Sequence, residues 1–118
     1  MKVALCFLIN YNNNLVKEEI WKDWITPNKD IIEVFIHYNK EIPITSEWIK
    51  THAIPEKYIE QTSYYHVVPA YMSVLQYAYK NNNNTQWFCL LTESCVPIIS
   101  PKKFRRIFKN TYNQSILA

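Results

Sequence analysis

Val3-Ala-Leu-Cys-Phe-Leu-Ile9 is the stretch that decides the fold: an unbroken apolar run, closed by the polar turn Asn10-Tyr-Asn-Asn-Asn14. A run without polar alternation is typical of a strand that is buried on both faces. Such a strand lies inside a sheet that carries a layer of helices on each side. The opening of the chain therefore predicts an α/β fold built on a parallel sheet.

Two later runs have the same apolar character, Ile31-Ile-Glu-Val-Phe-Ile-His37 and Trp87-Phe-Cys-Leu-Leu91. Apolar residues at helical spacing lie between the runs, over 17–25 and about 67–80, and Ser100-Pro101 is typical of a helix start. The connection from Tyr38 to Ser63 is less regular, with two short segments that form either helical turns or strands. The order β-α-β-(α)-α-β-α predicts adjacent parallel strands joined by right-handed crossovers.

Composition narrows the class of protein. The chain has 118 residues, 48% of them hydrophobic, which predicts one domain spanning residues 1–118 with a single core. It contains no glycine, which excludes the glycine-rich phosphate loops of Walker and dinucleotide-binding proteins. Asparagine is the best substitute for glycine at positive φ, so the runs Asn12 to Asn14 and Asn81 to Asn84 are expected in loops or turns.

Net charge and cysteine content indicate which partners and which compartment to expect. The net charge of +3 arises from residues 101–118, which carry five basic and no acidic side chains. This run is either a solvated helix face or a surface for phosphate or an anionic membrane, and no nucleic-acid partner is inferred. With no signal peptide and no apolar stretch of membrane-spanning length, a cytoplasmic location is expected. Cys6 and Cys89 are expected to be buried, unpaired thiols in a reducing compartment.

Ligands of parallel α/β sheets bind at the carboxyl ends of the strands. In this chain those ends are Asn10-Tyr11, His37–Asn39 and Thr92-Glu93-Ser94. Glu93 is the sharpest candidate, as a carboxylate that orients a sugar hydroxyl, coordinates a metal or acts as a base, or else as a turn residue held by backbone amides. His37 either joins a hydrogen-bonding cluster at this edge or is a structural residue.

Other reactive side chains are weaker candidates for a functional site. Cys95 acts as a nucleophile only with a base beside it. The pair Tyr64-Tyr65 either stacks on a base or sugar ring or belongs to the core or its rim. His52 and His66 lack the partner spacing of a zinc site, so no metal site is expected.

The segment Phe88-Cys-Leu-Leu-Thr-Glu-Ser-Cys-Val-Pro-Ile98 resembles "FVLLSESCIPL", which ends the central strand of the core-2/I-branching N-acetylglucosaminyltransferases and peptide xylosyltransferases, glycosyltransferase family 14. Weaker similarities occur in the same order: an opening strand over 2–8, Val34-Phe-Ile-His-Tyr-Asn-Lys40 for "YIHVDK", and Thr62-Ser-Tyr-Tyr65 for "TxWG". Together they span almost the whole chain. Two departures are Asn39, where the family usually has aspartate, and Tyr64-Tyr65, where it has Trp-Gly.

The resemblance implies a GT-A-like, Rossmann-like fold and a glycosyltransferase activity. The reaction would transfer N-acetylglucosamine or xylose from a UDP-sugar to a hydroxyl of a glycan or protein, with inversion and without a metal or other cofactor. Family enzymes are considerably longer, so the resemblance implies the nucleotide-binding half alone, with the catalytic base beyond Ala118 or on a second chain. Glu93 is a weaker candidate for that base. Eukaryotic members are usually anchored in the Golgi.

The resemblance also implies a donor site. Ile9 and Asn10 would flank the uracil, and Asn39 and Tyr64 would approach the nucleoside. His37 also belongs to the implied donor-binding residues. Glu93, Ser94 and Cys95 would border the sugar-phosphate. Two alternatives remain: a non-catalytic UDP-sugar-binding remnant, which binds without turnover, and a small flavodoxin-like module, which has no affinity for UDP.

Overall fold

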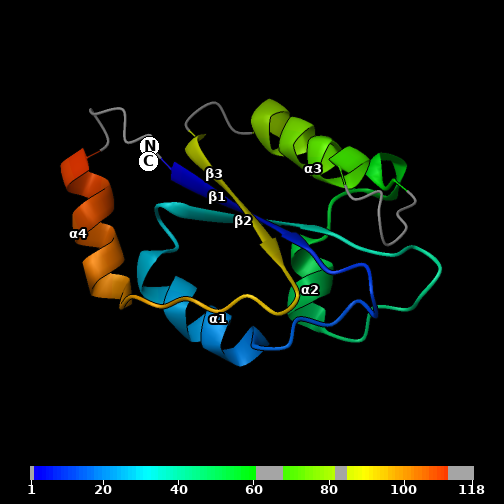
Figure 1. Ribbon diagram of the computed structural model, residues 1–118, viewed down its shortest axis with the longest axis horizontal. Helices are drawn as coiled ribbons and strands as arrows, with labels where there is room; N and C mark the ends of the chain where they lie inside the picture. The colour runs from blue at the N-terminus through cyan, green and yellow to red at the C-terminus, as the bar shows by residue number, and fades with distance from the viewer. Residues whose placement is uncertain (1, 61–67, 82–84, 112–118) are drawn as a thin grey trace.

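Three parallel strands form one sheet with helices on both faces in the computed structural model, which describes residues 2–60, 68–81 and 85–111 (Figure 1). The strands are β1 (Lys2–Leu8), β2 (Ile32–His37) and β3 (Thr85–Thr92). The helices are α1 (Glu18–Ile25), α2 (Glu47–His52), α3 (Val68–Asn81) and α4 (Pro101–Thr111), with short 3-10 turns at Thr26–Asn28 and Glu56–Tyr58. The α/β class and the strand and helix order predicted from the sequence are confirmed.

The strand order is β2-β1-β3, and β1 pairs in parallel with both neighbours. Leu8 at the end of β1 lies opposite His37 on one side and Thr92 on the other. The only register irregularity between β1 and β3 falls at the start of the pairing, between Lys2 and Val3. The prediction of three parallel strands is therefore confirmed, with β1 in the centre.

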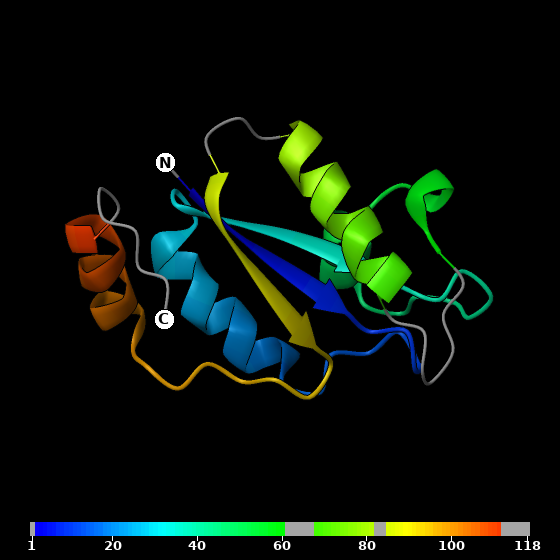
Figure 2. The same ribbon diagram turned by 45° about the horizontal axis from the view of Figure 1, so that its top comes forward.

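Each face of β1 packs against its own helical layer, as its apolar sequence requires. The residues of one face join a cluster with Trp21 of α1, Ile49 of α2 and Phe108 of α4. The other face, with Ala4 and Cys6, joins a cluster with residues of α3. Figure 2 shows α1 and α3 on opposite sides of the sheet. Small side chains meet on the α3 face, which lets this helix approach the sheet closely.

Indole N–H groups of α1 hold the segment that leads from β3 to α4. Trp21 Nε1 donates to the carbonyl oxygen of Cys95 at 2.9 Å, and Trp24 Nε1 donates to that of Ile99 at 2.6 Å. Ser100 Oγ accepts a hydrogen bond from the N–H of Lys103 at 3.1 Å, which caps α4 as predicted. The residues between β3 and α4 are thus fixed against α1 without secondary structure of their own.

The basic helix α4 is tied to the domain by one ion pair. The Arg105 guanidinium contacts both carboxylate oxygens of Asp30 at 2.8 Å and lowers the pKa of that carboxyl to about 2. Four other basic side chains of α4 are exposed: Lys102, Lys103, Arg106 and Lys109. No helix in the described ranges is long and apolar enough to cross a membrane.

Two sequence expectations need correction, and one that was left open is resolved. Cys6 and Cys89 are free thiols, and Cys6 is fully buried, but Cys89 is only half-buried because it lies on a strand at the edge of the sheet. The two thiols belong to clusters on opposite faces of the sheet, and burial raises the pKa of both, that of Cys6 to about 12. Asn81 belongs to the last turn of α3 instead of a loop. The two irregular segments after Tyr38 form helical turns.

Candidate functional site

The loop after β1 joins the carboxyl ends of all three strands. The N–H of Ile9 donates to the carbonyl oxygen of His37 at the end of β2, at 3.1 Å. Farther along the loop, the N–H of Val16 donates to the carbonyl oxygen of Glu93 beyond β3, at 2.9 Å. The strand ends singled out from the sequence are therefore brought together at one edge of the sheet.

Asn13 locks this loop to the loop after β2. It is fully buried and has a φ of 58°, the left-handed conformation in which asparagine replaces glycine. Its Nδ2 donates to the carbonyl oxygens of Asn39 and Ile42 at 2.7 and 2.8 Å, and its Oδ1 accepts from the N–H of Asn39 at 2.7 Å. The expected asparagine turn is confirmed. Asn13, in this turn, also connects the loop after β1 to the loop after β2.

His37 is fully buried at the end of β2, and both of its ring nitrogens are engaged. Nε2 lies 3.0 Å from the N–H of Glu60 and accepts its hydrogen, so the proton of the neutral ring is on Nδ1, which donates to Oδ1 of Asn10 at 3.0 Å. Burial lowers the pKa of His37 to about 4. The ring therefore orients Asn10 and anchors the segment at Glu60, and neither ring nitrogen is left for a ligand.

Asn39 is likewise occupied within its own loop. Its Oδ1 accepts a hydrogen bond from the N–H of Glu41 at 2.9 Å, and its backbone is held by Asn13. The structure thus places Ile9, Asn10, His37 and Asn39 together. Asn10 and Asn39 are half-buried, whereas Ile9 and His37 are fully buried. Tyr64, with the segment 62–65, lies outside the described residues.

A tight turn follows β3 and holds the remaining predicted site residues. The N–H of Cys95 donates to the carbonyl oxygen of Thr92 at 3.2 Å, and the Cys95 thiol accepts from the N–H of Thr92 at 3.3 Å. The hydroxyls of Thr92 and Ser94 lie 3.4 Å apart. The anchor of Glu93 is its backbone carbonyl, while its carboxylate forms no hydrogen bond or ion pair with a described residue.

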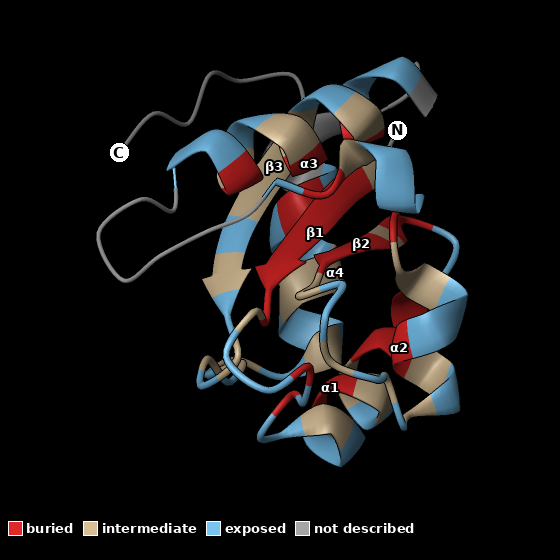
Figure 3. Cartoon of the chain, turned by 90° about the vertical axis from the view of Figure 1, so that its right-hand side faces the viewer, coloured by how far each residue is buried: buried red, intermediate tan, exposed pale blue. Residues whose placement is uncertain are grey.

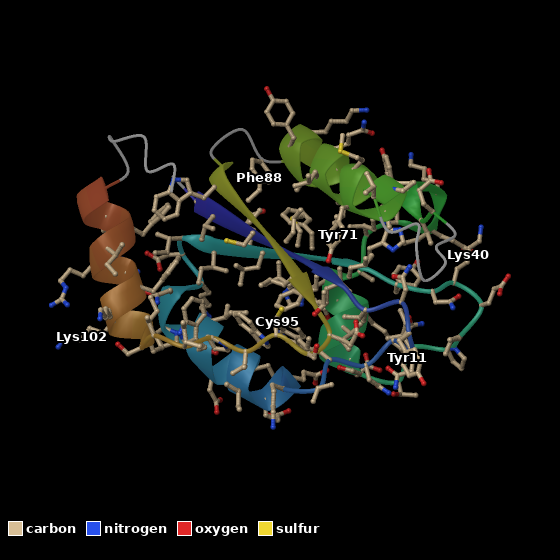
Figure 4. The ribbon with its side chains drawn as sticks, in the orientation of Figure 1. Tyr11, Lys40, Tyr71, Phe88, Cys95 and Lys102 are labelled. Atoms are coloured by element: carbon tan, nitrogen blue, oxygen red, sulfur yellow. The ribbon has the colours of Figure 1, made fainter. Side chains whose placement is uncertain are left out.

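Tyr71 is a residue of this site that sequence reasoning missed. Burial raises the pKa of the Tyr71 phenol, and the nearby Cys95 and Glu93 raise it further. Figure 4 shows Tyr71 on the sheet side of α3 and Cys95 beside the tip of β3. Its helical spacing indicated only a core position, because a period cannot show which neighbour a helix residue reaches.

Exposed aromatic and cationic side chains surround the same edge. Tyr11 is 81% exposed, and Figure 4 shows it with Lys40 on the loops beyond the ends of β1 and β2. Lys17 is exposed and adjoins Val16, which binds the β3 turn. A site on these loops therefore offers a ring for stacking, cations for an anion, and the Glu93 carboxylate. Lys17 carried no signal in the sequence, because its position depends on the contact between two loops.

The described part of the chain contains no cluster of metal-ligating side chains. No three side chains among its histidines, cysteines, aspartates and glutamates gather into a group that would hold a metal ion.

Comparisons of the chain with models of protein families, with curated protein sequences and with solved structures gave no match.

The buried neutral state of His37 predicts a pH-dependent stability. Because its folded pKa of about 4 lies below the ordinary value of 6.5, the unfolded chain binds more protons between these values. The free energy of unfolding should therefore fall as the pH is lowered from 7 to 4, by about 3 kcal/mol in total. Urea unfolding at a series of pH values measures it.

The variant His37→Gln supplies the control, because its side chain does not titrate. Its stability should be nearly flat over the same range, whatever its absolute value. Asp30 also loses stabilisation in acid, but with a pKa near 2 it does so below this window. An equal slope in the variant and the wild type would contradict the assignment to His37.

Proposed function

We propose that the chain binds a UDP-sugar at the carboxyl edge of its sheet, as the nucleotide-binding part of a GT-A-type glycosyltransferase. The reaction proposed is transfer of N-acetylglucosamine or xylose to a hydroxyl of a glycan or protein. The observation that carries the proposal is the meeting of three elements at one edge: the loop after β1, the end of β2 and the turn after β3.

The strand order supports a ligand at this edge. From β1 the chain crosses to β2 on one side, and later to β3 on the other, so the order reverses between β1 and β3. In open α/β sheets a ligand binds in the crevice outside such a switch point. The residues beside it are Asn10 and Tyr11 on one strand end and Glu93 to Cys95 on the other. This order is also that of flavodoxin-like sheets, so the identity of the ligand rests on the sequence resemblance.

A diphosphate at the switch point would be bound by side chains. The chain has no glycine loop, and α1, which follows the β1 loop, begins with Glu18 and Glu19, whose charges disfavour an anion at that helix start. Lys17 is exposed and directly follows Val16, whose N–H donates to the Glu93 carbonyl oxygen in the turn after β3. We therefore assign Lys17 to the diphosphate, Tyr11 to stacking on the uracil, and Glu93 to a hydroxyl of the sugar.

An assay of UDP-sugar hydrolysis and transfer decides whether this site also catalyses a reaction. Glu93 is the described carboxylate at the switch point, and it is oriented by no second side chain that would make it a base. Binding without hydrolysis or transfer would favour the non-catalytic remnant, and absence of binding would favour the flavodoxin-like module.

Calorimetric titration with UDP tests the proposal. We expect binding to the wild type, and an affinity about tenfold lower for Lys17→Ala, because a charge-assisted contact with phosphate contributes about 1.5 kcal/mol. Lys29→Ala is the matched control, since Lys29 is also exposed but precedes β2 at the opposite edge of the sheet. No heat of binding with the wild type, or equal losses in both variants, would contradict the proposed site.

A second prediction concerns Glu93. Because its anchor in the turn is the backbone carbonyl, Glu93→Gln should leave the melting temperature almost unchanged. It should reduce the increase in melting temperature that UDP-N-acetylglucosamine or UDP-xylose produces, because a charged acceptor for a sugar hydroxyl is lost. Thermal unfolding of both proteins, with and without each UDP-sugar, measures the two effects.

Asp23→Asn is the control for Glu93→Gln, since Asp23 is an exposed carboxylate on α1 without a hydrogen bond or ion pair to a described residue. It should change neither quantity. If Glu93→Gln were instead less stable by about 1 to 2 kcal/mol with an unchanged ligand shift, the carboxylate would be a turn anchor and the donor role would be rejected.

A further inference from the structure

β3 lies at one edge of the sheet. Among the described residues no strand pairs with its outer side, because β1 occupies the other side. From Trp87 to Thr92 the strand is regular, and it carries neither a charge nor a proline. Folded proteins usually protect such an edge with lysine, proline, a bulge or a covering segment, since its free N–H and C=O groups accept another strand.

The opposite edge of the sheet, formed by β2, is covered by a bridged segment and carries an ion pair. On β2, Ala53 forms a parallel bridge to Ile36, and the N–H of Ile54 donates to the Ile36 carbonyl oxygen at 3.0 Å. β2 also carries Glu33, paired with Lys2 at 2.8 Å. Figure 3 shows β1 buried from Val3 to Leu8, whereas β3 is a mixture of intermediate and exposed residues from Trp87 to Thr92. The β2 edge therefore has a bridged neighbour and a charged residue, and the β3 edge has neither among the described residues from Trp87 to Thr92.

Exposed apolar side chains occur on β3 and on α3. Leu90 on the α3 face of β3 is 46% exposed, although the aligned Cys6 of β1 is fully buried. On α3, Val68, Met72 and Tyr79 follow one another at helical spacing and are 67, 50 and 71% exposed. Leu90 thus adds an exposed apolar group to an uncharged strand edge, and exposed apolar groups of this kind are typical of an interaction surface.

We propose that β3 pairs in antiparallel orientation with β3 of a second copy of this chain, across a two-fold axis. A two-fold interface requires a patch that is complementary to itself. The strand meets this requirement: from Gln86 to Thr92 it is polar at both ends and apolar in the middle, so reversing its direction about Cys89 preserves the pattern. It brings no like charges together. The inference does not depend on UDP binding.

The faces of the sheet restrict the register of this pairing. Side chains alternate between faces, so only residues of the same parity can lie opposite each other in a continuous sheet. Placing Cys89 opposite Cys89 of the second copy sets Phe88 against Leu90, and Trp87 against Leu91. The apolar residues on both faces then meet across the axis.

Sedimentation equilibrium across micromolar to millimolar concentrations tests the dimer. The wild type should approach a mass of twice 14.2 kDa, whereas Leu90→Lys should raise the dissociation constant at least about 100-fold, because two ammonium groups would be buried near the axis. Ile98→Lys is the matched control, with an apolar side chain that is 92% exposed outside the proposed interface. A wild type that stays monomeric at every concentration would overturn the proposal.

Amide hydrogen exchange locates the interface independently of any variant. Amides within 85–92 should exchange more slowly at concentrations where the dimer forms than where it dissociates. A dimer that forms without added protection in 85–92, or that Leu90→Lys leaves intact while the variant keeps the wild-type circular dichroism, would place the contact elsewhere and overturn the β3 pairing.

Discussion

The burial of β1 on both faces and its pairing on both edges is the constraint on which the rest of the structure depends. Two apolar faces require two helical layers, so α3 covers one and α1, α2 and α4 cover the other. Parallel neighbours on both sides require crossover connections that return each strand in the same direction. All three strands therefore end at one edge, and the loops that follow them meet there.

Those loops are held together by buried polar side chains. Asn13 uses both ends of its amide on the backbone of the β2 loop, and His37 uses both ring nitrogens between Asn10 and the segment at Glu60. A buried polar group that lost such a partner would cost about 1 to 3 kcal/mol. Residues that looked like ligand contacts in the sequence thus serve as a rigid base. The exposed groups in front of them are the ones available to a ligand.

Much of the fold could be predicted because apolar runs and helical spacing are local signals. The strand at 3–9, the cap at Ser100 and the turn at Asn13 all follow from neighbouring residues. The exposure of Cys89 could not be predicted, since it depends on which strand lies at the edge. Nor could the bonds of Trp21 and Trp24 or the approach of Tyr71 to Glu93, which join distant segments. A hydrogen-bonding or structural role for His37 was predicted, but its two partners, Asn10 and the N–H of Glu60, could not be named for the same reason.

The central claim is that the joined strand ends form a nucleotide-sugar site. Nuclear magnetic resonance of the labelled amides tests it most directly, because each segment of the edge reports separately during titration with UDP. The account predicts shift changes confined to residues 9–17, 37–42 and 92–95. Changes confined to the exposed lysines and arginine of α4, or none at saturating UDP, would contradict it.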